Sequence, residues 1–326
     1  MEIWLALIGG FVLLVAGGEL LVRGAVQVAS RLGVSPLVIG LTLVGFGTSA
    51  PELVTSVQAA INGSPGIAYG NVVGSNIANL LLILGTSALL TPIMVASMAL
   101  KRDGAVMLVV TLLFAGLAAT MPMNQVIGAG FLVLLASYIY FAFRQESQPS
   151  AATNHGAAYE KGAAAQSVDA GLTPKPSVGS IVLPILIAIV GLGLVVAGGY
   201  FLVNGAVALA RLWGISETVI GLTIVAVGTS LPELVTSIMA AIRKQTDVAF
   251  GNIIGSNIYN TLGIAGTTAL ISPSVVPREI VTSDNLVMIV ASVVVIALAY
   301  TGRKIARWEG LLLLAGYIGY LVWLWP

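Results

Sequence analysis

The chain has 326 residues, of which 58% are hydrophobic and only 8% charged, and its formal net charge is +1. A soluble domain carries about 25% charged residues, so this composition excludes one and indicates an integral membrane protein. The absence of cysteine excludes disulfides, thiolate metal sites and a cysteine nucleophile. The net charge gives no indication of a nucleic-acid partner and we expect none; the partner that the composition indicates is the lipid bilayer.

Apolar runs account for nearly all of the chain, since one bilayer crossing needs about 20 apolar residues. Because these runs are continuous rather than alternating, they favour helices over a β-barrel. The first run has no preceding basic region and no small-residue cleavage site, so we expect a span rather than a signal peptide. In chain order the ten predicted spans cover residues 3–22, 36–61, 66–91, 103–121, 125–143, 181–201, 217–242, 247–272, 284–301 and 309–325, with the first and sixth extending to about 31 and 212.

Basic residues divide unequally between the two faces of this ten-span chain. With both termini outside, twelve of the fourteen Lys and Arg residues fall on the cytoplasmic side, and only Arg211 and Arg278 fall outside. Under the positive-inside rule, this predicts a multi-pass protein of the cell membrane with extracytoplasmic termini. The tryptophans near the ends of spans are expected to be interfacial anchors: Trp4, Trp213, Trp308, Trp323 and Trp325.

The chain contains an internal duplication. Residues 40–92 and 221–273 align without a gap, and 31 of the 53 positions are identical. At the same offset, residues 10–40 align with residues 191–221. Each half then holds five helices, and because five is odd the second copy enters the membrane from the opposite face. Inverted repeats of this kind are typical of secondary transporters, which bind substrate near the midplane where the repeats meet.

The expected architecture is therefore an all-α integral membrane protein with ten transmembrane helices arranged as two inverted five-helix repeats. The first repeat covers residues 1–143 and the second covers 181–326. Residues 144–180 between them are polar and rich in Ala, Ser, Gly and Pro, so we expect a flexible, disordered cytoplasmic linker. The only histidine, His155, lies there, and we interpret it as a solvated side chain rather than a pH sensor.

Each repeat carries the motif GTSxPE inside an apolar segment, ending in Glu52 or Glu233. A carboxylate at membrane depth is energetically expensive, so its presence in both copies predicts a functional site. The proline before each glutamate breaks the helix, and freed carbonyls at that depth need protein, water or ions as partners. The hydroxyls four and three residues earlier share a helix face with the glutamate: Thr48, Ser49, Thr229 and Ser230.

A second motif, GSNIxN, follows in each repeat. Ser75 and Asn79 lie four residues apart, as do Ser256 and Asn260, so each pair shares one helix face. Together the two motifs supply carboxylate, hydroxyl, amide and carbonyl oxygens without sulfur or imidazole. Such a set suits hard cations such as Ca²⁺ or Na⁺ and argues against zinc or copper.

The two glutamates set a charge balance. Two neighbouring carboxylates in a low dielectric stay ionised only if cations compensate them; otherwise a proton is retained. One Ca²⁺ or two Na⁺ would neutralise Glu52 and Glu233 equally, and competition for the same two charges favours antiport. A purely structural hydrogen bond between the glutamates is the simpler alternative, but their symmetric position within a full oxygen set favours a site.

Other residues have simpler interpretations. Pro51 and Pro232 could be structural kinks, and the glycines and serines could be packing positions. Asn71 and Asn252 are expected to fasten the helix entry rather than bind ions. Glu19 lies four residues before Arg23, which indicates a local ion pair. Acidic residues at the ends of spans, such as Asp103 and Asp284, are expected to be solvated.

The doubled GTSxPE and GNxxGSNIxN motifs resemble the α-repeats of the sodium/calcium exchangers in the calcium/cation antiporter superfamily, over nearly the whole chain. The resemblance implies Ca²⁺ exchange against Na⁺ by alternating access, with the first and sixth helices sliding past a fixed core. It implies no enzymatic activity and no cofactor besides the transported ions. The ion ligands that it implies are Thr48, Ser49, Glu52, Ser75, Asn79, Thr229, Ser230, Glu233, Ser256 and Asn260, with the carbonyls of Gly45 and Ala226.

One position departs from the family pattern. Well-studied relatives have an aspartate where this chain has Asn260, which leaves coupling stoichiometry, pH sensitivity and K⁺ co-transport open. Within the same architecture, the alternatives are an exchanger that uses H⁺ or K⁺. A passive cation channel is a further alternative, whereas an intramembrane enzyme is disfavoured because the spans carry no cysteine or histidine. The sequence is compatible with a monomer.

Overall fold

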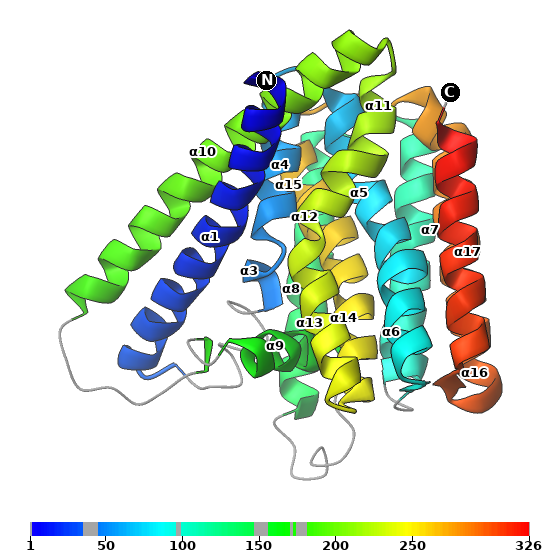
Figure 1. Cartoon of the computed structure of the whole chain (residues 1–326). Coiled ribbons are helices and arrows are strands. Elements are labelled where there is room, and N and C mark those ends of the chain that lie inside the picture. The colour runs from blue at the N-terminus through cyan, green and yellow to red at the C-terminus, as the bar shows by residue number, and fades with distance from the viewer. Residues whose placement is uncertain are drawn as a thin grey trace.

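The computed structural model describes residues 2–34, 45–95, 99–146, 156–169, 172–173 and 181–325. Within these ranges six helices are long and apolar enough to cross a membrane, and a seventh span results if one bent pair of helices is counted together. A helical, multi-pass membrane protein is therefore confirmed (Figure 1). The second predicted span, 36–61, is described only from residue 45 onward.

The first half begins with one long helix and continues through shorter, broken ones. Its elements are α1 (Glu2–Arg31), α3 (Gly45–Gly47), α4 (Ala50–Ile61), α5 (Pro65–Ile77), the π-helical turn η2 (Ala78–Ile83), α6 (Leu84–Leu90), β1 (Ile93–Met94), the π-helical turn η3 (Ala99–Gly104), α7 (Ala105–Thr120) and α8 (Gln125–Glu146). A further helix, α9 (Ala157–Val168), lies between the halves.

The second half has a similar order, with its strand later in the sequence. Its elements are α10 (Val182–Trp213), α11 (Glu217–Ile220), the π-helical turn η6 (Gly221–Val225), α12 (Ala226–Thr229), α13 (Leu231–Ile242), α14 (Thr246–Ile258), the π-helical turn η7 (Tyr259–Ile264), α15 (Ala265–Ile271), the π-helical turn η8 (Ile280–Asp284), α16 (Asn285–Gly302), β2 (Lys304–Ile305) and α17 (Arg307–Leu324). The strands β1 and β2, which the sequence did not predict, form a short antiparallel pair.

The long helices α1 and α10 pack against each other and stand to one side of the bundle (Figure 1). Glycines spaced seven residues apart let the two backbones meet. A Cβ added at Gly17 would lie 2.7 Å from the Val195 nitrogen, and one added at Gly198 would lie 2.7 Å from the Gly10 oxygen. Small residues of this kind drive close helix association in membranes. The predicted extension of the first and sixth helices is confirmed, because α1 ends at Arg31 and α10 at Trp213.

The core of the bundle is formed by the helices that carry the duplicated motifs. α5 and α14 are buried along nearly their whole length, with Tyr69, Phe250 and Tyr259 fully enclosed. The π-helical turns η2 and η7 follow the GSN motifs at matching positions and carry Asn79 and Asn260. Such turns widen the helix locally and are frequent at functional sites. The duplication in sequence is thus repeated in backbone geometry.

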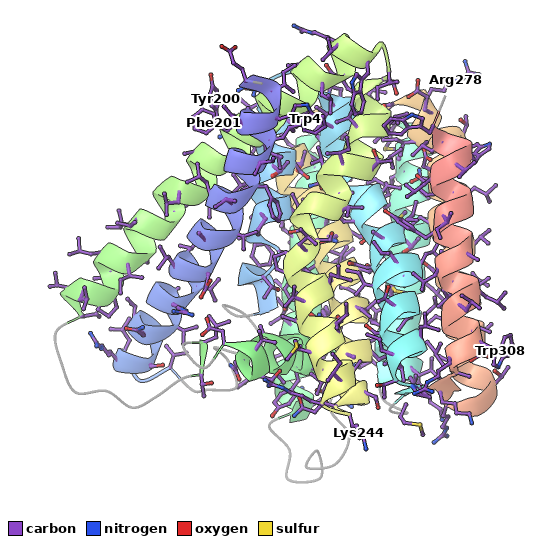
Figure 2. All side chains as sticks on the ribbon, in the orientation of Figure 1. Trp4, Tyr200, Phe201, Lys244, Arg278 and Trp308 are labelled. Carbon is purple, nitrogen blue, oxygen red and sulfur yellow. The ribbon has the colours of Figure 1, made fainter. Side chains whose placement is uncertain are left out.

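Both chain termini and a cluster of three tryptophans lie at the same end of the helix bundle. Both termini lie at one end, with Trp4 and Arg278, while Lys244 and Trp308 lie at the other (Figure 2). The ring of Trp213 lies 6.1 Å from that of Trp4 and 5.7 Å from that of Trp325. All three indoles are exposed, so they form an aromatic cluster suited to a membrane interface.

Two acidic residues expected to be solvated are buried instead. Asp103 and Asp284 are 0% and 1% exposed. Each accepts a hydrogen bond from a tyrosine on a later helix, at 3.2 Å from Tyr138 of α8 and 2.9 Å from Tyr320 of α17. The expectation was wrong because a distant tyrosine satisfies each carboxylate, and a partner of that kind is not visible at a span end in sequence.

Part of the expected disordered linker is folded. Residues 157–168 form α9, which packs into the bundle against α14 and α13. The run contains five alanines, and high helix propensity was the one local indication of this helix. His155 lies outside the described residues.

Candidate functional site

Each motif glutamate lies in the first turn of a helix that begins at a break. α4 begins at Ala50 and α13 at Leu231, each with its proline in the first turn, where a missing N–H is tolerated. The two segments that meet at Ser230 are bent by 49°. The predicted helix breaks are therefore confirmed. They place Glu52 and Glu233 at the positive end of a helix dipole, which favours a carboxylate there.

The two half-sites are joined by crossed hydrogen bonds. Ser49 Oγ donates to Glu233 Oε1 at 3.1 Å, and Ser230 Oγ donates to Glu52 Oε1 at 3.1 Å. All four side chains are at most 2% exposed. The serine of one repeat thus orients the carboxylate of the other, and the two motifs form one site.

Several oxygens of this site have no hydrogen-bond partner. Among the described residues these include Glu52 Oε2, Glu233 Oε2, Asn79 Oδ1 and Asn260 Oδ1, all of them buried. An unsatisfied buried acceptor is destabilising by about 1–3 kcal/mol, and more when it is charged. Cations such as Ca²⁺ are coordinated by six to eight such oxygens, so a bound cation would satisfy these atoms.

Of the remaining predicted ligands, Thr229 and Ser75 are buried near the Ala226 carbonyl, whereas Thr48 is partly exposed. Thr229 Oγ1 donates to Asn71 Oδ1 at 2.9 Å and lies 3.3 Å from the Ala226 carbonyl oxygen. Ser75 Oγ lies 3.5 Å from the same carbonyl. Thr48 is only half-buried, and its hydroxyl donates to the Gly45 carbonyl at 3.3 Å. The described side-chain hydrogen bonds connect neither the Thr48 hydroxyl nor the Gly45 carbonyl to the glutamates.

Asn71 and Asn252, the asparagines that follow glycine in the GNxxGSN motif of each repeat, fasten helices together, as the sequence indicated. Asn71 donates to the Glu52 carbonyl at 3.1 Å and to Ser56 Oγ at 2.9 Å. Asn252 makes the matching bonds, at 3.4 Å to the Glu233 carbonyl and 2.8 Å to Ser237 Oγ. These amides hold α5 on α4 and α14 on α13, and so fix the backbone beside each carboxylate.

Asn76 and Asn257 were not predicted as ligands, but they lie within the duplicated motif and make buried hydrogen bonds beside the predicted ones. Asn79 Nδ2 donates to Asn257 Oδ1 at 2.9 Å, and Asn76 Nδ2 donates to Thr261 Oγ1 at 2.9 Å. Both bonds cross between the repeats. Their position one residue after Ser75 or Ser256 was the available signal.

Lys161 was not expected at the site. Its side chain is fully buried, with Nζ 2.6 Å from Ser256 Oγ and 3.4 Å from Glu233 Oε1. Its ammonium group also lies 5.9 Å from the centre of the Tyr259 ring. The duplication gave no signal for Lys161, because the linker is not repeated.

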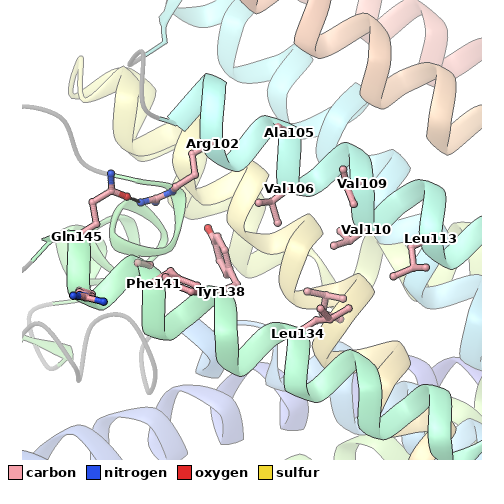
Figure 3. Close-up of a pocket in the computed structure, with 13 residues that line it drawn as sticks. Arg102, Ala105, Val106, Val109, Val110, Leu113, Leu134, Tyr138, Phe141 and Gln145 are labelled. Atoms are coloured by element: carbon pink, nitrogen blue, oxygen red, sulfur yellow. Dashed lines mark hydrogen bonds between the residues drawn. The ribbon is translucent and has the colours of Figure 1, made fainter.

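Of two cavities that lie between helices of the described chain, one touches the motifs. A groove of about 840 Å³ between α7 and α8 is lined mainly by apolar side chains such as Val106, Val110 and Leu134 (Figure 3). It contains none of the predicted ligands. A cavity of about 490 Å³ between α1, the helix breaks and the end of α9 is lined by Thr48 and Pro232, among others. This second cavity reaches the helix breaks from outside the core.

Known proteins resemble this chain over nearly its full length. The family model described as "Sodium/calcium exchanger protein" matches residues 2–144 and again residues 183–325. CaxA of Alkalimonas amylolytica is 38% identical over 95% of each chain. The sodium/calcium exchanger MaX1 of Methanosarcina acetivorans is 36% identical, over 98% of this chain and 97% of its own.

Solved structures agree with the sequence relatives. A structure of the sodium-calcium exchanger NCX_Mj, soaked with Na⁺ and Sr²⁺, superposes with a TM-score of 0.63 at 30% identity, covering 99% of this chain and 98% of that one. Another, soaked with Na⁺ and Ca²⁺, gives a TM-score of 0.62 at 32% identity, over 97% and 96% of the two chains.

Broken helices that bring two buried carboxylates and a set of neutral oxygens together inside an apolar bundle define a membrane cation transporter. The family model, which matches most of the chain, identifies the family of transporters to which it belongs. The chain belongs to the sodium/calcium exchanger family.

Proposed function

We propose that the chain is a secondary antiporter that exchanges Ca²⁺ for Na⁺ across a cell membrane by alternating access. The observation that carries the proposal is the buried pair Glu52 and Glu233, each held by the serine of the other repeat and each left with one unpartnered oxygen. The two negative charges match one Ca²⁺ or two Na⁺, so either load neutralises the site. Without a bound cation the pair keeps an uncompensated negative charge in a low dielectric, which disfavours reorientation without cargo.

The transported ions would be bound by the twelve positions inferred from the family resemblance. Their supporting features are burial, oxygen chemistry and the free acceptor atoms of Asn79 and Asn260. The set is Thr48, Ser49, Glu52, Ser75, Asn79, Thr229, Ser230, Glu233, Ser256 and Asn260, with the carbonyls of Gly45 and Ala226. The cavity beside Thr48 supplies a route by which cations would reach it.

The complete fold would be ten spans in two inverted repeats, residues 1–143 and 181–326, joined by the linker 144–180. The antiparallel pair α1 and α10, the matching π-helical turns and the double family match support this arrangement. The pair α1 and α10 would move past the remaining helices. Both termini would be extracytoplasmic and the linker cytoplasmic, on the strength of the unequal distribution of basic residues. We propose no enzymatic activity and no cofactor.

The test is uptake of ⁴⁵Ca²⁺ into proteoliposomes loaded with Na⁺. Uptake should require an outward Na⁺ gradient and should collapse when external and internal Na⁺ are equal. Varying pH and K⁺ on each side separates Na⁺ exchange from exchange that uses H⁺ or K⁺. Uptake that ignored every counter-gradient would identify a passive channel and overturn the proposal.

A further inference from the structure

We propose that α9 is an inhibitory segment of the chain itself, which places the ammonium group of Lys161 in the cation site in place of a transported ion. The inference rests on the assignment of Glu52 and Glu233 as the transport site. Lys161 Nζ lies within 3.4 Å of Glu233 Oε1 and 2.6 Å of Ser256 Oγ, which are both proposed ion ligands. A cation of this chain therefore already occupies part of the site.

The burial of Lys161 indicates a specific position rather than a passing contact. A lysine is almost never fully buried unless it is paired. Here the side chain is 0% exposed and its charge faces a carboxylate that is 2% exposed. Removing two charges from water is expensive, and only good geometry with further hydrogen bonds offsets that cost. The bond to Ser256 provides such a contact.

α9 is fastened to the bundle at both of its ends. At its start, the Ala157 N–H donates to Asp103 Oδ2 at 2.6 Å, and Asp103 is the buried carboxylate that also accepts from Tyr138. At its end, the Ser167 carbonyl accepts a hydrogen bond from Arg243. One residue beyond the helix, Asp169 pairs with Arg23 of α1 at 2.6 Å. The segment thus connects α1 to the helices that carry the site.

α9 packs closely on two glycines of α14. Gly70 and Gly74 of α5 pack directly on the backbone around Leu222 in η6. The corresponding glycines of α14 are Gly251 and Gly255, and a Cβ added at them would meet Glu160 and Lys161 of α9. Among the described residues, a helix of the linker is therefore a close neighbour of the second half-site.

The charge of Lys161 explains why such a contact would inhibit transport. One ammonium group offsets one of the two carboxylates, so Ca²⁺ or Na⁺ must displace it to bind both. A tethered group competes at an effective concentration on the order of millimolar, whatever the protein concentration. The inhibition should consequently be strongest when cations are scarce and should disappear when they saturate the site.

The first test measures equilibrium ⁴⁵Ca²⁺ binding to the full-length protein and to Lys161→Met, a neutral side chain of similar length. If α9 fills the site in about four molecules of five, the variant should bind Ca²⁺ about five-fold more tightly. Lys101→Met, at an exposed lysine, is the matched control and should leave binding unchanged. Unchanged or weaker binding by Lys161→Met would overturn the inference. If the unmodified protein bound no Ca²⁺, the assignment of Glu52 and Glu233 as the transport site would be contradicted, and the inference would fail for that reason.

The second test does not depend on the lysine substitution. The chain has no cysteine, so a single thiol placed by Ala164→Cys, at a position 0% exposed in α9, reports whether the helix is docked. Maleimide labelling should be slow without cations and several-fold faster in saturating Ca²⁺. Val168→Cys, at the exposed end of the same helix, should label rapidly in both conditions. Labelling of Ala164→Cys that is independent of Ca²⁺ would contradict displacement of α9.

Discussion

Ser49 of the first repeat donates a hydrogen bond of 3.1 Å to the carboxylate of Glu233 in the second. The reciprocal bond, from Ser230 to Glu52, has the same length. Each carboxylate is therefore oriented by a residue from the opposite half, and neither half can assemble the site alone. Because the two hydrogen bonds are equivalent, removing either one should have a similar effect on the site.

Removing either serine hydroxyl should weaken Ca²⁺ binding to a similar extent. Ser49→Ala and Ser230→Ala each delete a hydrogen bond to a charged group, which contributes about 1.5–3 kcal/mol. Ca²⁺ affinity, measured by ⁴⁵Ca²⁺ binding, should fall by about ten-fold or more in each variant. Ser87→Ala is the matched control, because Ser87 is a buried serine of α6 whose hydroxyl has no hydrogen-bond partner. A large effect at one serine only would contradict the symmetric site.

Neutralising either glutamate should abolish Ca²⁺ exchange. Glu52→Gln and Glu233→Gln keep the shape of the side chain but leave a doubly charged ion facing one carboxylate. Breaking a buried charge interaction in this way is destabilising by about 3–5 kcal/mol, so Na⁺-driven ⁴⁵Ca²⁺ flux should drop at least about 100-fold. Glu279→Gln, at an exposed carboxylate, is the control. Normal Ca²⁺ flux in either site variant would exclude these carboxylates as ligands.

The paired glutamates could be predicted from the sequence because every needed signal is local. Proline, hydroxyl and carboxylate lie within one helical turn, and the duplication shows that the pattern is not accidental. Since the two copies of the motif meet through crossed hydrogen bonds, a local pattern is enough to predict a joint site. The expected helix breaks, the Glu19–Arg23 ion pair and the roles of Asn71 and Asn252 follow from the same short-range rules.

Other features depend on partners that are distant in the chain and could not be predicted. Asp103 is buried with a hydrogen bond from Tyr138 of α8, and it also accepts a hydrogen bond from the first residue of α9. The position of Lys161 depends on where an unrepeated alanine-rich helix docks. Neither periodicity nor duplication contains that information, although alanine content does indicate a helix. Sequence patterns therefore describe the repeats well and the linker poorly.

Introducing aspartate at the two symmetric asparagines should have unequal effects. Asn79 Nδ2 donates to Asn257 Oδ1 at 2.9 Å, so Asn79→Asp places a carboxylate against a buried acceptor. Both asparagines have an unpartnered Oδ1, but the described hydrogen bonds include a bond from the side-chain nitrogen to a buried acceptor only for Asn79. We expect Asn79→Asp to lower the free energy of unfolding by about 1–3 kcal/mol and Asn260→Asp to lower it less.

The measurement is thermal unfolding of both variants in the same detergent, with Ca²⁺ binding as a second readout. Asn260→Asp should tighten Ca²⁺ binding, because it adds a negative charge beside the cation. If the two substitutions lowered the free energy of unfolding equally, the expected difference between Asn79 and Asn260 would be contradicted.

Close contact between α1 and α10 should depend on particular glycines and not on glycine in general. A Cβ at Gly17 would lie 2.7 Å from the Val195 nitrogen, and a Cβ at Gly191 would lie 2.3 Å from the Leu21 nitrogen, so alanine at either position must push the backbones apart. Overpacking of this kind typically destabilises by about 1–3 kcal/mol. Gly9 and Gly193 lie on the same two helices with nothing within 4 Å of an added Cβ. Gly17→Ala and Gly191→Ala should therefore lower Tm and slow Na⁺-driven Ca²⁺ exchange, whereas Gly9→Ala and Gly193→Ala should change neither. If all four variants unfold and transport alike, the proposed role of the helix pair as a closely packed moving unit is wrong.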